Sequence, residues 1–281
     1  MLPLKLPIGA LVEAAVEWSL DRFDVTFRAV SDGLDTAVAA LQDVLLSAPP
    51  WLLIAVLAAL ARLVAGWGMA ALVVAGLLII DSIGLWEPTW ETFSLVVVAE
   101  ILVVVIGLPL GILASHNDWV DRLLRPVLDF MQTMPSFVYL IPAVMLFGLG
   151  TVPGVLATVV FALPPLVRLT NLGIRQVPSD LVEAGEAFGS SPWQMLAKIQ
   201  LPVALPTIMA GVNQSIMMAL SMVVIAAMIG AGGLGAEVLR GIQRLQIGSG
   251  FEAGLAVVLL AMTLDRFTQS VGKFRRTTEG G

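Results

Sequence analysis

Long apolar stretches separated by short polar ones run through most of this chain from residue 50 onward. A membrane-spanning helix needs about 20 mainly apolar residues. The candidate spans cover approximately 50–66, 68–86, 93–114, 130–149, 153–171, 203–230 and 252–272. The first two form a hairpin, because Ala-Gly-Trp-Gly at 65–68 divides one run that is too long for a single span. The pattern therefore predicts an all-α integral membrane protein with about seven transmembrane helices.

Residues 1–49 differ from the rest, because acidic side chains are frequent and apolar ones are scattered. Two apolar sets recur at helical spacing, Leu11, Ala15, Trp18 and Phe23 in the first and Leu34, Val38, Leu41 and Leu45 in the second. We expect an extracytoplasmic amphipathic segment that lies on the membrane or on the rest of the protein. A disordered tail is the alternative.

A polar stretch, Glu183 to Pro202, interrupts the apolar second half of the chain. Asp180 is expected to cap a first helix, with Glu183 in the reciprocal capping position. Gly189 would end that helix, since glycine accepts the left-handed conformation found past a helix C-terminus. Ser191 followed by Pro192 has the form of an N-cap and a first-turn proline. The stretch therefore predicts two short helices joined at a sharp corner.

Two acidic residues fall inside apolar runs. Glu100 lies about eight residues, or roughly 12 Å, into its span, so it needs a polar partner on a neighbouring helix or else must be protonated. A proton relay would suggest a secondary transporter, but the other spans offer no charged companions, which favours structural pairing. Asp81 lies near an end of its span and is expected to be solvated.

Composition agrees with a membrane protein and excludes several functions. The chain is 58% hydrophobic and 13% charged, with a mean hydropathy of +0.94, which is incompatible with a soluble globular domain. The absence of cysteine excludes disulfides and thiolate catalysis. His116, the lone histidine, is expected in a polar loop, and no metal site is predicted. The net charge of -6 argues against nucleic acid as a partner.

The basic residues indicate an orientation. If the Glu183 loop is cytoplasmic, ten of the fifteen Lys and Arg residues lie inside: Arg62, Arg122, Arg125, Arg168, Arg175, Lys198, Arg266, Lys273, Arg275 and Arg276. The positive-inside rule supports this arrangement. It places the N-terminus outside and the C-terminus in the cytoplasm.

The stretch Glu183-Ala184-Gly185, then Gly189, then Ile199-x-Leu201-Pro202 resembles the coupling motif of the membrane subunits of ATP-binding cassette (ABC) importers. Gly185 stands where that family commonly has a second alanine. The resemblance implies that these residues contact the ATPase: Glu183, Ala184, Gly185, Gly189, Ile199, Leu201 and Pro202. An ordinary cytoplasmic helical hairpin is the alternative.

The segments 129–150 and 201–235 resemble the permeases of the glycine betaine/proline, or quaternary amine, type of ABC importer. The resemblance implies a five-helix type I importer core over 90–275 with a coupling loop at 178–202, preceded by two additional helices at 50–88 and followed by a cytoplasmic tail at 276–281. It further implies a bacterial cytoplasmic membrane protein, a homodimer, a separate cytoplasmic ATPase and an external substrate-binding protein. No G-x-x-x-x-G-K-[ST] motif occurs, so the partner ATPase is expected to bind ATP and Mg, and no cofactor is expected on this chain.

The glycines from Gly230 to Gly235 match G-x-G-x-x-G, but they follow an apolar helix rather than a strand, which argues against dinucleotide binding. A glycine-rich external turn that flexes with an outer gate, or a plain tight loop, is expected instead.

Polar and aromatic residues inside two spans are candidates for the transport pathway, because polar groups in lipid are costly unless they face a cavity or a partner. They are Gln132, Ser136, Phe137 and Tyr139 in one span, and Asn213, Gln214, Met217 and Ser221 in another. Aromatic faces suit the diffuse charge of a quaternary ammonium group. Close helix packing is the competing interpretation of the second set.

The sequence thus predicts a permease subunit that moves betaine-like compatible solutes by alternating access and is not itself an enzyme. A permease for choline, carnitine or a methionine-like solute shares the same motif and is the first alternative. An ion-coupled secondary transporter is a second. An intramembrane enzyme is disfavoured, because the spans offer no converging catalytic groups.

Overall fold

The computed structural model describes residues 8–278, and every regular element in that range is helical. The elements are α1 (Ile8–Ser47), α2 (Pro50–Ala65), α3 (Trp67–Ser82), α4 (Trp86–His116), α5 (Asp118–Thr133), α6 (Ser136–Phe147), α7 (Thr151–Arg175), α8 (Ser179–Ala187), α9 (Pro192–Met195), a π-helix η1 (Leu196–Gln200), α10 (Leu201–Ala227), α11 (Gly233–Gln243) and α12 (Ile247–Thr278). The predicted all-α fold is confirmed. Residues 1–7 and, of the predicted tail at 276–281, residues 279–281 lie outside the described range.

Four helical stretches among the described residues are long and apolar enough to cross a membrane by themselves: α4, α7, the continuous stretch Pro192–Ala227, and Ile247–Ser270 of α12. The number reaches six if each of two sharply bent helix pairs counts as one span. The predicted hairpin at 50–86 forms as α2 and α3, but each has 16 residues. At 1.5 Å per residue each is about 24 Å long, shorter than a hydrocarbon core of about 30 Å.

The span expected at 130–149 is wrong in its bounds. Helices α5 and α6 meet there at an angle of 100°. Pro135 causes the break, because proline disfavours the helical conformation in the residue before it, and Met134 is extended with ψ of 133°. The hydroxyl of Tyr139 donates a hydrogen bond back across the bend to the Met131 carbonyl. The pair is therefore a fixed elbow rather than a straight span.

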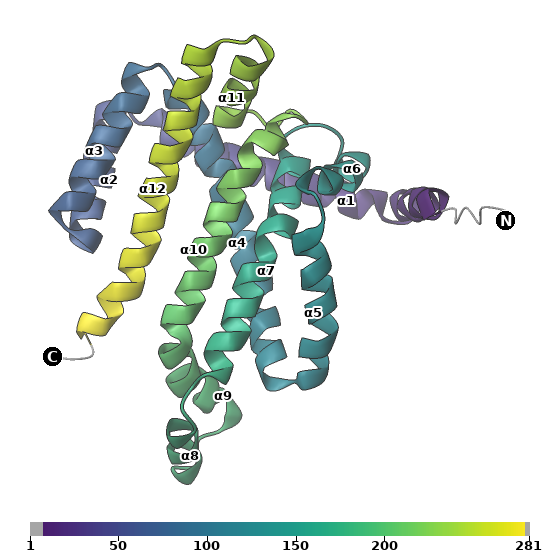
Figure 1. Ribbon diagram of the computed structural model, residues 1–281, viewed down its shortest axis with the longest axis vertical. Coiled ribbons are helices and arrows are strands. Elements are labelled where there is room, and N and C mark those ends of the chain that lie inside the picture. The colour runs from purple at the N-terminus through teal and green to yellow at the C-terminus, as the bar shows by residue number, and fades with distance from the viewer. Residues whose placement is uncertain (1–7, 279–281) are drawn as a thin grey trace.

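The centre of the bundle is formed by α4, α7 and α10, which run side by side (Figure 1). Leu166 of α7 is fully buried between the other two. Gly107 of α4 and Gly211 of α10 both face it, and a Cβ on either would stand 3.2 Å from an atom of Leu166. Small residues permit such close approach of helices in a membrane.

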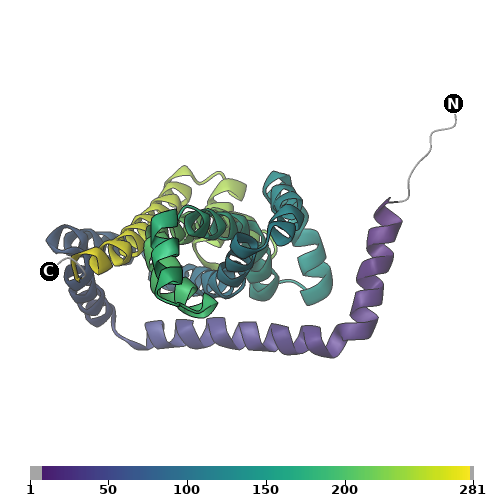
Figure 2. The same cartoon turned by 90° about the horizontal axis from the view of Figure 1, so that it is seen from below.

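Helix α1 runs along one side of the bundle and then bends away from it (Figure 2). The bend falls at Phe23, whose φ and ψ of −123° and 17° are not helical. Val38 is buried, and Leu34, Leu41 and Leu45 pack against the core, whereas Leu11 and Trp18 are exposed. The second predicted amphipathic set therefore packs on the protein, while the exposed residues of the first lie free of it.

Candidate coupling site and transport pathway

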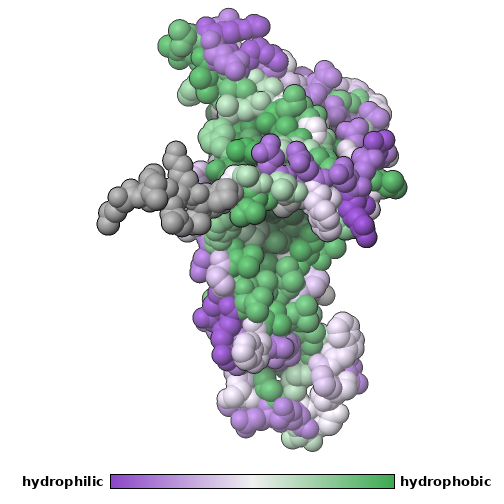
Figure 3. Space-filling view, turned by 90° about the vertical axis from the view of Figure 1, so that its right-hand side faces the viewer, coloured by the Kyte–Doolittle hydropathy of each residue, from purple (hydrophilic) through white to green (hydrophobic). Residues whose placement is uncertain are grey.

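Helices α8 and α9 project from one end of the bundle, beyond the ends of α7 and α10 (Figure 1). The far end carries α11. We call residues 178–202, which contain α8, α9 and η1, the knob. On the face shown in Figure 3, hydrophobic residues dominate the middle, whereas polar and weakly hydrophobic residues gather at the knob end. The knob therefore lies beyond the hydrophobic middle of the molecule, at the end opposite α11.

The corner between the two short helices is built on Gly189. Its φ of +75° lies in the left-handed region, which glycine adopts without steric cost. Gly189 N–H donates to the Glu186 carbonyl at 2.9 Å and Ser190 N–H to the Gly185 carbonyl at 3.0 Å. These two bonds are the Schellman arrangement that satisfies the last carbonyls of a helix. The prediction that Gly189 ends the first helix is confirmed.

The knob has two arms, α8 and the helical stretch formed by α9 and η1. The second arm begins as predicted at Ser191, whose hydroxyl accepts a hydrogen bond from Gln194 N–H while the Gln194 side chain accepts one from Ser191 N–H. The predicted cap of the first arm is wrong. Pro178 occupies the N-cap position of α8, no side chain caps it, and Asp180 lies within the first turn. Pro178 supplies the extended backbone that an N-cap needs, and Asp180 still complements the positive end of the helix dipole.

The two arms pack together over Gly185, which is buried. A Cβ at this position would stand 2.6 Å from Ile199 Cδ1 and 2.7 Å from Met195 Cε. Met195 is itself 8% exposed. The departure from alanine at position 185 therefore accommodates two longer side chains on the opposite arm. What the first arm loses in helix propensity is offset by packing between the arms.

The second arm is continuous with a membrane span. The π-turn of η1, in which Leu201 N–H bonds to the Leu196 carbonyl, leads directly into α10. Pro202 cannot donate a hydrogen bond to the preceding turn, which favours such a widened turn. His116, expected in a loop, is the last residue of α4, and its Nε2 lies 3.2 Å from Gln200 Oε1. The knob is thereby joined to α10 by continuous helical backbone and to α4 by one polar contact.

Two large aromatic side chains of the knob are highly exposed, and neither is among the predicted coupling residues. Phe188 is 91% exposed and Trp193 is 73% exposed. Glu183 and Ala184 are also exposed. Aromatic residues are enriched in protein interfaces and depleted where a surface faces only water. Their positions beside the corner glycine were the available signal in the sequence.

Polar pairs hold the base of the knob end together. Asp121 of α5 accepts a 2.7 Å hydrogen bond from Asn171 of α7 and a 2.6 Å bond from Arg125. Arg175 of α7 bonds to Asp118 and to the Ala114 carbonyl. These contacts join α4, α5 and α7 where they approach the knob.

The structure brings only part of the predicted pathway set together. Gln214, Met217 and Ser221 share one exposed face of α10, whereas Asn213 turns toward α12 and accepts a 2.9 Å hydrogen bond from Thr268. Gln132 and Phe137 are exposed, and Ser136 is half-buried. Tyr139 is 5% exposed and packs with Leu140 and Met222. Its ring is thus part of a small core rather than of an open surface.

The glycine-rich turn is held in place at its α11 end. Glu91 Oε2 accepts a 2.7 Å hydrogen bond from Gly233 N–H, and Thr92 Oγ1 accepts a 2.8 Å bond from Leu234 N–H. Both acceptors belong to α4 and cap the first turn of α11, a helix that the sequence analysis did not predict. A Cβ at Gly235 would stand 2.2 Å from the Val223 carbonyl oxygen. Close packing and φ of +77° at Gly232 and +66° at Gly233 explain these glycines.

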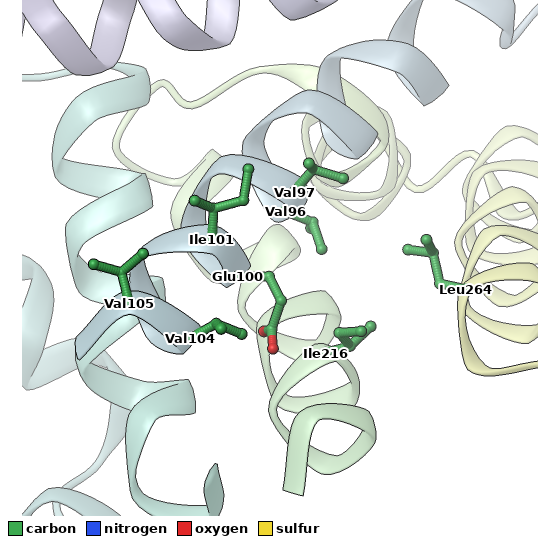
Figure 4. Close-up of a pocket in the computed structure, with 8 residues that line it drawn as sticks. All are labelled: Val96, Val97, Glu100, Ile101, Val104, Val105, Ile216 and Leu264. Atoms are coloured by element: carbon green, nitrogen blue, oxygen red, sulfur yellow. The ribbon is translucent and has the colours of Figure 1, made fainter. Parts of the chain in front are cut away.

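Glu100 has the interhelical partner that its depth predicted. Ser215 of α10 donates a 2.5 Å hydrogen bond to its Oε1, while Oε2 has no partner among the described residues. The carboxylate lies beside a hollow of about 270 Å³ whose other lining residues are aliphatic, among them Val104 and Ile216 (Figure 4). The described residues contain no group of three or more His, Cys, Asp or Glu side chains that could hold a metal ion.

A bundle of helices long and apolar enough to cross a membrane, with a polar knob continuous with one of them, defines the class of this protein as an integral membrane protein. The chain belongs to the family of binding-protein-dependent transport system inner membrane components, whose family model matches residues 107–276. It is therefore an integral membrane permease subunit of an ABC importer rather than an ATP-hydrolysing one.

The names of similar proteins agree with this family assignment. The chain is 48% identical over 98% of its length to the glycine betaine transport system permease protein OpuAB of Bacillus subtilis, and covers 98% of that protein. It is 49% identical over 97% of its length to the glycine betaine/proline betaine permease ProW of Escherichia coli, and covers 77% of it. Among solved structures, an inward-facing MetNI methionine ABC transporter matches with a TM-score of 0.56 and 26% identity, over 66% of this chain and 91% of that chain.

Proposed function

We propose that this chain is the permease of an importer for betaine-like compatible solutes, driven by a separate ATPase that binds the knob. The observation that carries the proposal is the continuity of the knob with α10. The motif residues Glu183, Ala184, Gly189 and Pro202 are exposed on it or at its junction with the span. The substrate class follows from the names of relatives that are 48–49% identical to this chain over the aligned region.

The proposed mechanism is alternating access. Closure of two ATPase subunits on ATP would draw two knobs together, and each knob would tilt α10 as a lever. Gly185 and the Schellman corner stiffen the lever, since an arm that gave way at its joint would lose the displacement. The transporter would also use an external substrate-binding protein, as the family description states for its members.

We infer a homodimer from the exposed face of α10. Gln214 and Ser221 are polar residues in a membrane-spanning helix, and exposing them to lipid is costly. A second copy of the chain that packs across this face would enclose Gln214, Met217 and Ser221 in a shared pathway. Gln132, Ser136 and Phe137 of the elbow helices are further candidates there, whereas Asn213 and Tyr139 would have to leave their present partners.

The coupling role is tested by uptake of radiolabelled glycine betaine into proteoliposomes that hold the chain, its ATPase and its binding protein. Phe188→Ala and Trp193→Ala are expected to reduce ATP-driven uptake at least tenfold, the loss that about 1.4 kcal/mol of interface energy gives. Trp119→Ala is the matched control, because Trp119 is 72% exposed at the same end but outside the knob. Equal uptake by all three variants would contradict the role of the knob.

Two further measurements in the same assay address the alternative substrates and the alternative of a secondary transporter. Excess unlabelled choline, carnitine or methionine should compete less effectively than glycine betaine if the proposed substrate class holds. Uptake driven by an ion gradient without ATP would instead identify a secondary transporter.

We propose that the knob is cytoplasmic and the α11 end is outside, which agrees with the basic residues near the knob. The chain contains no cysteine, so single cysteines report orientation directly. A membrane-impermeant maleimide is expected to label Leu245→Cys in intact cells, and Phe188→Cys only after permeabilisation. Both positions are about equally exposed, at 87% and 91%.

A further inference from the structure

A second hollow, of about 390 Å³, lies between the α2–α3 hairpin and helices α4, α10 and α12. In Figure 1 this hairpin stands beside α12 at the edge of the bundle. The lining is almost wholly apolar and includes Leu77 of α3, Met209 of α10 and Leu260 of α12. The hydroxyls of Thr263 and Thr268, which also line it, already donate to Leu259 O and to Asn213 Oδ1.

One polar group on the lining is unsatisfied. Trp90 of α4 is 2% exposed, and its indole N–H has no hydrogen-bond partner among the described residues. An unmade hydrogen bond of a buried donor is costly, so an occupant with an acceptor would be favoured. Trp90 lies about 6 Å along α4 from its first residue, Trp86, near the α11 end of the bundle. Tryptophan is enriched at this level, where headgroups meet acyl chains.

Water does not suit this hollow, because a buried water needs two to four polar partners. An empty hollow would deprive the lining atoms of dispersion contacts. The lining stretch of α12, Leu259 to Thr268, rises about 14 Å. The space is thus elongated along the bundle and apolar over its length, with Trp90 toward its outer end.

We propose that this hollow binds one glycerophospholipid from the leaflet at the α11 end of the bundle. One acyl chain occupies the apolar space and the glycerol end lies beside Trp90, whose indole nitrogen is covered in this structure and turns to donate to an ester carbonyl oxygen. The lipid completes the contact between the hairpin, whose helices are short for a full span, and the transport core.

Gly76 of α3 allows the site to be filled without disturbing the backbone. A Cβ there would make ordinary contacts of 3.7 and 3.8 Å with Leu259, and both residues line the hollow. Gly76→Leu therefore places a side chain in the space proposed for the acyl chain. Gly68→Leu is the matched control, because Gly68 is an exposed residue of the same helix with nothing within 4 Å of its Cβ position.

The test is native mass spectrometry of the full chain, purified in detergent and washed free of loosely held lipid. We expect a retained phospholipid mass on the wild type and on Gly68→Leu, and its loss from Gly76→Leu. Trp90→Phe keeps a ring but removes the donor, and titration with a synthetic phosphatidylglycerol or phosphatidylethanolamine should show roughly fivefold weaker binding. Trp51→Phe is the control for that variant, since Trp51 is 70% exposed.

Equal lipid retention by Gly76→Leu and the wild type would overturn the proposal. So would a retained mass that corresponds only to detergent. An unchanged titration for Trp90→Phe would refute the ester contact. Because uptake is not the readout, these outcomes are independent of the transported solute.

Discussion

Ser215 of α10 donates a 2.5 Å hydrogen bond to Glu100 of α4, and both side chains are buried. The bond joins two of the three central helices at a depth where water is scarce. The same hydroxyl lies 2.8 Å from the Val212 carbonyl oxygen, so its single proton is shared between an acceptor on its own helix and the carboxylate of α4. Ser215 thus supplies the one hydrogen bond that the Glu100 carboxylate has among the described residues.

Ser215→Ala is expected to lower the free energy of unfolding by about 1–3 kcal/mol, because it leaves a buried carboxylate without a partner. The measurement is the loss of tryptophan fluorescence on heating the protein in detergent. Ser221→Ala is the control, since that hydroxyl is exposed and its one hydrogen bond among the described residues is to the Met217 carbonyl of its own helix. Equal melting temperatures for the two variants would show that the interhelical bond contributes nothing.

Gly235→Ala is expected to destabilise the α10–α11 corner. The new Cβ would meet the Val223 carbonyl oxygen at 2.2 Å, and a backbone atom cannot rotate away as a side chain can. Forced displacement in a packed core costs roughly 1–3 kcal/mol. The same melting experiment checks this, with Gly248→Ala as control because nothing lies within 4 Å of its Cβ position. A flexible turn, as the sequence first suggested, would tolerate both changes equally.

The all-helical membrane fold and the corner of the knob were predictable because their signals are local. Apolar length sets the spans, and Gly189 with Ser191 and Pro192 sets the turn without help from the rest of the chain. The partner of Glu100 was predictable as a necessity but not as Ser215, because only the packing of α4 on α10 brings the two together.

Other features depend on tertiary contacts and could not be read from the pattern. Pro135 could either kink a continuous helix or break it into two, and the pattern does not distinguish these outcomes. The contact of Tyr139 across the break depends on how the two helices are placed. Helix α11 is capped by Glu91 and Thr92, residues more than 140 positions earlier in the chain. The glycines beside it therefore looked like a flexible turn, when close packing explains them.

Gly185 tests the packing of the two arms of the knob. Gly185→Val is expected to impair ATP-driven uptake, because its side chain would collide with Met195 and Ile199. Met195→Ala removes one of the two and should restore part of the activity in the double variant. A double-mutant cycle on uptake measures this coupling. Additive effects of the two changes would show that the arms do not act through this contact.

Gly189 tests whether the corner must keep its shape for coupling. Proline cannot adopt φ of +75° and would also remove the N–H that bonds to Glu186. Gly189→Pro should therefore abolish uptake, and Gly189→Ala should reduce it, since a left-handed conformation costs an L-residue about 1–2 kcal/mol. Gly189→Asn should remain close to the wild type, because asparagine visits this conformation more readily.

The substitution Glu183→Arg tests the surface charge of the knob without changing its shape. Glu183 is exposed and forms no ion pair within the residues that the structure describes, so the change should leave the melting temperature unaltered. If the ATPase presents basic or hydrogen-bond donor groups to it, the reversed charge weakens assembly through repulsion and lost bonds. Glu186→Arg, on the same helix and also exposed, is the matched control. Co-purification of the ATPase and ATP-driven uptake should both fall for Glu183→Arg and much less for Glu186→Arg, whereas equal losses would reduce the effect to net charge at the knob.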